Sequence, residues 1–254
     1  MNKNTAKYFI LYVKQYYIWG VIVIFSLYLI SIISKAPTIN SKLFFLIIGS
    51  FIVSGTIYYE YLKKVYQKMI VAQTQLLNPT LVKQYQAQLQ RLDFFKGFNG
   101  SLILFDTLCF IDQGQYQACL DHLFKHEKFF KGKVDYLFIF YYHQLLCYYF
   151  LDQPKNALAM VIKLNQFKLI KPKKVAPLFS FEQIDGIGYL LNNRTQKGLT
   201  TLENIDLQLF NSRERKLHYL IMLKTAKEKQ ETKRIKNYQK AIKKLSGGEK
   251  NETL

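Results

Sequence analysis

The clearest grouping of metal-ligating side chains is Cys119, His122 and His126, spaced as C-x2-H-x3-H. On a helix these positions share one face, as the ligands of a zinc ion must. Asp121 and Glu127 are close in sequence, but no second ligand cluster occurs, and Cys119 also suits a small, buried packing position. We therefore predict no metal site and keep these three residues as the candidates to examine.

Motifs for nucleotide and cofactor chemistry are incomplete. The phosphate-binding pattern G-x4-G-K-[ST] does not occur, and Gly186-Ile187-Gly188 lacks the third glycine of a dinucleotide site. The segment LSGGE at 245–249 resembles the signature of ABC transporter ATPases, which requires a phosphate-binding loop elsewhere. Glu182 and Asp185 share a helix face, as carboxylates on a solvated surface often do. We predict no catalytic residue, no cofactor and a protein that is not an enzyme.

The chain is strongly basic, with 36 Lys and Arg against 17 Asp and Glu and a net charge of +19. Lys, Asn, Ile, Tyr and Phe are abundant, as AT-rich codons produce, so the total charge alone does not indicate a polyanionic ligand. The charge is concentrated in residues 224–250 and 169–174, where it favours anionic lipid headgroups. Nucleic acid is not expected, because no binding motif accompanies the charge. The candidate contacts are Lys63, Lys64, Lys68, Lys171, Lys173, Lys174, Lys233, Arg234, Lys236, Lys243 and Lys244.

Two uncharged segments near the N-terminus, about residues 15–34 and 43–59, predict a transmembrane helical hairpin. The first would be about 30 Å long as a helix, which matches a bilayer core. Tyr and Trp stand at the segment ends, at the depth that amphipathic rings prefer. A cleaved signal peptide is the alternative, but Pro37 would be the first mature residue and the apolar run is long for that role.

Lysines flank the outer ends of both predicted spans, which by the positive-inside tendency places both termini in the cytoplasm of a multi-pass cell-membrane protein. The three cysteines suit a reducing compartment. Residues 136–151 are a third apolar run, but they are only sixteen residues long. We predict a buried soluble helix there, with a third span as the alternative.

The sequence after the second predicted span predicts a series of helices. Asn78-Pro79 predicts a helix start, since Asn caps well and Pro fits the first helical position. We divide the chain into a hairpin at 1–60, juxtamembrane helices at 61–98, a helical domain at 99–246 and a flexible tail at 247–254. The predicted fold class is all-α.

Residues 100–245 contain degenerate helical hairpins. Turns are predicted at 112–114, 152–154 and 192–193. In the first hairpin, Gly114, Tyr116 and Cys119 follow an apolar helix, and small residues return at Ala157, Gly198 and Ala241, with spacings of 38, 41 and 43. This pattern resembles the tetratricopeptide repeat, although that family's period is about 34 and its closing proline is missing here. The resemblance implies a solenoid that binds a protein or peptide. An ordinary all-α bundle is the alternative.

Together these features predict a membrane-anchored interaction scaffold with an unidentified protein partner and an oligomeric state that the sequence does not define. Two other functions stay open: a bacterial self-protection protein, acting in bacteriocin immunity or phage abortive infection, and a membrane-tethered nucleic-acid binder.

Overall fold

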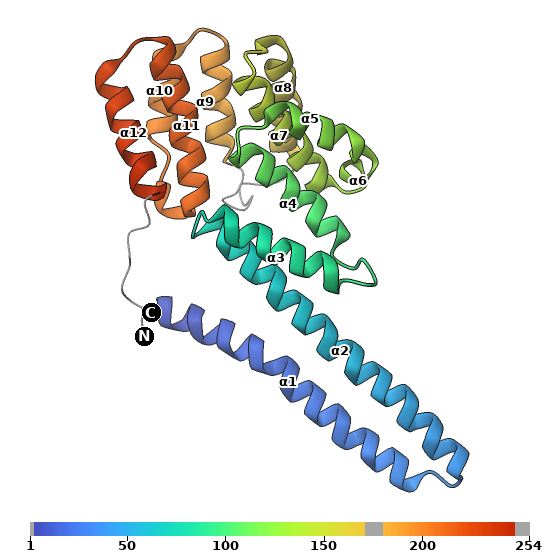
Figure 1. Cartoon of the computed structure of the whole chain (residues 1–254). Helices are drawn as coiled ribbons and strands as arrows, with labels where there is room; N and C mark the ends of the chain where they lie inside the picture. Colours follow the sequence, from blue (N-terminus) through green and yellow to red (C-terminus); the bar gives the residue numbers. More distant parts are fainter. Residues whose placement is uncertain (1–2, 171–179, 247–254) are drawn as a thin grey trace. The chain divides into compact units, whose positions relative to one another are not determined.

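The computed structural model describes residues 3–170 and 180–246, and this part of the chain is helical without any strand (Figure 1). Three of the candidate lipid contacts, Lys171, Lys173 and Lys174, lie outside the described residues, as does the predicted tail at 247–254. The chain divides into two compact units, Met1–Tyr66 and Gln67–Leu254, with the boundary inside helix α2.

The first unit contains α1 (Lys3–Lys35) and most of α2 (Ile39–Thr74). Residues Tyr17–Lys35, with a mean hydropathy of 2.2, and Ile39–Thr74, with 1.6, are long and apolar enough to cross a membrane. Their large apolar side chains are widely exposed, for example Ile24 at 69 % and Phe51 at 77 %. Exposed apolar surface of this extent is unfavourable in water and suits a lipid environment.

The second unit begins with the end of α2, where Met69 and Ala72 are buried, and continues with α3 (Pro79–Leu92). The predicted start of α3 is confirmed, because the Asn78 side chain accepts hydrogen bonds from the amides of Thr80 and Leu81. This cap satisfies two backbone N–H groups that the first helical turn leaves open.

Four helical hairpins follow along the chain (Figure 1). Each helix packs on the next one in sequence, so the contacts are compatible with a helical repeat architecture. A short helix and a 3₁₀ turn connect some of the hairpins. In chain order the elements are α4 (Asn99–Asp112), α5 (Tyr116–Lys125), α6 (Glu127–Lys131), α7 (Val134–Phe150), α8 (Pro154–Ile170), α9 (Phe181–Leu191), α10 (Thr195–Glu203), η1 (Leu207–Leu209), α11 (Ser212–Glu228) and α12 (Thr232–Ser246).

The four hairpin turns share one backbone geometry. Each contains a residue in the left-handed region, with φ of 70° at Gly114, 56° at Asp152, 59° at Asn193 and 56° at Gln230. In each turn the residue after the left-handed one donates its backbone N–H to the carbonyl five residues before it, at an N···O distance of 2.9 Å. These bonds satisfy carbonyls that the helix end leaves open. The turns predicted at 112–114, 152–154 and 192–193 are therefore confirmed.

Small residues allow the two helices of a hairpin to approach closely. Cys119, Ala157 and Gly198 each stand five residues after the left-handed residue, and all three are buried. In the fourth hairpin this position is Ile235, so the prediction of Ala241 was wrong by six residues. The reason is that Gln230, which is not a typical turn residue, marks the turn there.

Helix α7 forms the centre of the second unit. Leu145, Leu146 and Cys147 are fully buried, and the helix packs on α5 and α8. Residues 136–151 therefore lie in a protein core, and among the described helices only the two N-terminal ones are candidates to cross a membrane.

Candidate functional site

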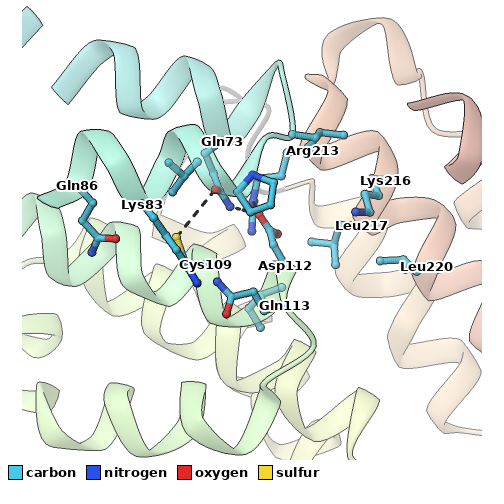
Figure 2. Close-up of a pocket in the computed structure, with 14 residues that line it drawn as sticks. Gln73, Lys83, Gln86, Cys109, Asp112, Gln113, Arg213, Lys216, Leu217 and Leu220 are labelled. Atoms are coloured by element: carbon cyan, nitrogen blue, oxygen red, sulfur yellow. Dashed lines mark hydrogen bonds and ion pairs between the residues drawn. The ribbon is translucent and has the colours of Figure 1, made fainter. Parts of the chain in front are cut away.

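A pocket lies between the end of α2, α3, the end of α4 and α11, all within the second unit (Figure 2). Its volume is about 200 Å³. Its lining combines apolar side chains with charged and amide side chains. The lining residues are Gln73, Leu77, Pro79, Val82, Lys83, Gln86, Cys109, Ile111, Asp112, Gln113, Arg213, Lys216, Leu217 and Leu220.

An ion pair between α4 and α11 organises the polar side chains of the pocket. Arg213 Nε donates to Asp112 Oδ2 at 2.7 Å, and the Gln73 amide donates to the same carboxylate oxygen. Asp112 is the last residue of α4, where the helix dipole disfavours an anion, and the guanidinium compensates for this. Figure 2 shows Arg213 reaching from α11 towards Gln73 and Asp112.

Arg213 is not fully paired. Its side chain is only 5 % exposed, and its Nη2 atom is buried without a hydrogen-bond partner among the described residues. Leaving a buried donor on a charged group unsatisfied costs about 1–3 kcal/mol or more, so such groups are rare in stable folds. The unpaired edge of this guanidinium therefore has capacity for a further acceptor.

The charges around the pocket are mainly positive. Arg213, Lys83 and Lys216 contribute three cations, and Asp112 is the one acidic residue among the described lining residues. Six of the other lining residues are apolar: Leu77, Pro79, Val82, Ile111, Leu217 and Leu220. Pockets with mostly apolar walls and a few placed polar groups are typical of small-molecule sites.

Cys109 lines the pocket as a protonated thiol. Burial, together with the charges of Asp112 and Asp106, raises the pKa of Cys109 to about 12. Its Sγ lies 3.9 Å from Gln73 Oε1, as a weak donor would. The thiol is therefore unsuited to nucleophilic chemistry at neutral pH.

We expect Cys109 to react with iodoacetamide at pH 7.5 more than about 100-fold more slowly than a free cysteine, whose pKa is about 8.5. The rate should be measured by mass spectrometry of the native, membrane-reconstituted chain. Labelling of Cys109 at the rate of free cysteine would contradict this account of its environment.

The structure does not bring the metal candidates together around one point. Cys119 is fully buried, and its thiol donates to the Thr107 carbonyl at 3.8 Å. His122 Nε2 lies 3.0 Å from the Ile103 carbonyl, and the His126 ring is beside the His122 ring at 4.8 Å. No group of three His, Cys, Asp or Glu side chains that could hold a metal occurs in the described part of the chain.

Glu182 and Asp185 also have separate partners. Glu182 accepts from the Ser180 hydroxyl at 2.7 Å, which lowers the pKa of Glu182, while Asp185 pairs with Lys168 at 2.6 Å. These contacts hold the start of α9 and join it to α8.

The described lipid-contact candidates fall into two groups. Some are engaged locally: Arg234 pairs with Glu231 at 2.7 Å and Glu203 at 3.3 Å, Lys63 pairs with Glu60 at 3.0 Å, and Lys64 lies over the Trp19 ring at 5.6 Å. The others are exposed on α2 or α12, namely Lys68, Lys233, Lys236 and Lys243, while Lys244 is exposed on α12 and also interacts with a neighbouring group.

Sequence reasoning missed the pocket. Its ion pair joins Asp112 to a residue 101 positions later, and neither residue belongs to a recognisable motif. The one available signal was that Asp112 ends a helix, where an anion needs compensation.

Comparison with protein-family models, with curated proteins and with solved structures gives no match to this chain. The class that the fold itself defines is an all-α protein with two helices able to cross a membrane and a domain of successive helical hairpins.

Proposed function

We propose that this protein is a membrane-anchored scaffold that binds another protein through a tetratricopeptide-like domain on the cytoplasmic side. The observation that carries the proposal is the repeated turn: four successive helical hairpins with the same left-handed residue and the same hydrogen bond. Hairpins that pack mainly on their neighbours form extended surfaces, which proteins of this architecture use for binding.

The contacts of the polar residues favour binding over catalysis. The buried histidines, His143 and His218, form hydrogen bonds inside the helical stack, and the carboxylates of Asp185 and Asp152 pair with Lys168 and Lys224. The two apolar N-terminal helices would hold the domain at a membrane, with both termini in the cytoplasm. The exposed lysines of α12 would then be available to anionic headgroups.

The proposal is tested by crosslinking in cells, followed by purification of the full chain from solubilised membranes and mass spectrometry. A matched variant with glutamine in place of Lys233, Lys236, Lys243 and Lys244 separates charge-driven capture from binding to the helical surface. A discrete protein that both chains retain at 0.5 M salt is the expected result. Recovery of nucleic acid alone, lost as salt is raised, would contradict the scaffold proposal.

A further inference from the structure

We propose that the pocket between α3, α4 and α11 binds a small organic acid that carries one carboxylate on an apolar body. The carboxylate would pair with the Arg213 guanidinium, and the apolar body would contact the leucine, valine and proline side chains of the lining. This proposal does not depend on the protein partner proposed above, because every residue that lines the pocket belongs to this chain.

The guanidinium supports a carboxylate ligand. Arg213 is 5 % exposed, its Nε is occupied by Asp112, and its Nη2 has no partner in the described part of the chain. Guanidinium groups bind carboxylates through planar, charge-assisted hydrogen bonds. A ligand oxygen would therefore satisfy a donor that the protein alone leaves unpaired.

The charge balance favours a single negative charge. Lys83 and Lys216 add two cations to the pocket, so an anion is attracted there. However, the Asp112 carboxylate forms an ion pair with the same guanidinium and would repel a dianion more strongly than a monoanion. A carboxylate fits this arrangement better than a phosphate monoester.

The volume of the pocket and its apolar lining residues indicate the size and polarity of the rest of the ligand. A cavity of about 150 Å³ holds benzene, so the pocket's volume of about 200 Å³ suits a body of the size of a substituted benzene ring or a short acyl chain. Leu77, Val82 and Leu220 provide apolar contacts from three separate segments.

The test uses the full chain in phosphatidylcholine nanodiscs, with 3-phenylpropionate as the probe in isothermal titration calorimetry. Empty nanodiscs give the background. We expect saturable binding with a Kd below about 1 mM. The neutral isostere 3-phenylpropanamide should bind at least about tenfold more weakly, since it cannot form the charge-assisted bonds. Phenyl phosphate should also bind more weakly than the carboxylate.

Variants separate the pocket from nonspecific attraction. Lys216→Gln should weaken binding several-fold, whereas Lys227→Gln, an exposed lysine on the same helix outside the pocket, should leave it unchanged. Leu220→Trp fills the cavity without touching the ion pair and should abolish binding. The double variant Asp112→Asn/Arg213→Gln, which removes both charges together, should lose the preference for the carboxylate over the amide.

Four results would overturn the proposal. The first is equal affinity for the acid and the amide, and the second is affinity that Leu220→Trp does not change. The third is tighter binding of phenyl phosphate than of the carboxylate, and the fourth is no binding of the carboxylate by the wild-type chain at several millimolar. The ligand comparison and Leu220→Trp decide the question even if the double variant does not fold.

Discussion

Replacing Gly198 by valine should lower the free energy of unfolding of the hairpin domain by about 3 kcal/mol. Gly198 stands where α9 and α10 cross, and a Cβ atom there would lie 2.5 Å from Leu190 Cδ2 and 3.0 Å from the Gly186 carbonyl oxygen. Leu190 could turn aside, but the carbonyl belongs to the α9 backbone, so the helices would have to separate. Valine's higher helix propensity offsets only a few tenths of a kcal/mol of this cost.

Thr200→Val is the matched control, because Thr200 is exposed on the same helix and the substitution introduces the same side chain. We expect it to change stability by less than about 0.5 kcal/mol. Urea unfolding of the full chain in micelles, followed by circular dichroism, measures both. Equal stability of the two variants would show that α9 and α10 do not pack as closely as described.

Acidification should destabilise the hairpin domain by about 5 kcal/mol between pH 7 and pH 4.5, through His143 and His218. Burial lowers the pKa of each from 6.5 to about 4. His143 Nδ1 donates to the Ile139 carbonyl at 2.8 Å, and the nearby Arg213 charge also disfavours the imidazolium. His218 Nδ1 lies 3.5 Å from the Gln183 amide nitrogen.

The sign follows from which state binds more protons. Below pH 6.5 the unfolded chain protonates both histidines, whereas the folded chain keeps them neutral until about pH 4. The stabilising contribution is therefore complete above pH 6.5 and is lost as the pH falls towards 4, with a loss of about 2–3 kcal/mol per histidine by pH 4.5. Urea titrations at half-unit pH intervals measure it.

The variant His143→Gln/His218→Gln should flatten this pH profile, because glutamine does not titrate. Its stability at pH 7 is expected to be lower than that of the wild-type chain, since both sites are tightly packed. A variant whose stability falls with pH as steeply as the wild type would contradict the assignment to these histidines.

Local sequence signals predicted the elements whose causes are local. The cap at Asn78 and the turns at Gly114, Asp152 and Asn193 depend on backbone preferences of single residues, which can be read from the sequence. The fourth turn, at Gln230, has no such residue, and the predicted register of the last hairpin was therefore wrong.

The candidate site was beyond sequence reasoning for a different reason. Its ion pair, its unpaired guanidinium and its cavity all depend on how α11 packs against α3 and α4, far away along the chain. Conversely, the spacing of Cys119, His122 and His126 suggested a common face, but Cys119 is buried in the core while His122 binds a backbone carbonyl. Periodicity places residues on one helix without showing what each side chain contacts.

The central proposal, a two-span anchor with a cytoplasmic hairpin domain, is tested most directly by cysteine accessibility in cells. Two single-cysteine substitutions, Asn40→Cys and Lys229→Cys, probe the two sides of the membrane. Asn40 lies in the first turn of α2, next to the loop after α1, and Lys229 lies in the turn between α11 and α12. Both positions are exposed. A membrane-impermeant maleimide should label Asn40→Cys on intact cells and Lys229→Cys only after permeabilisation, with the parent chain as background. Labelling of Lys229→Cys on intact cells, or release of the chain from membranes by alkaline carbonate, would contradict the proposal.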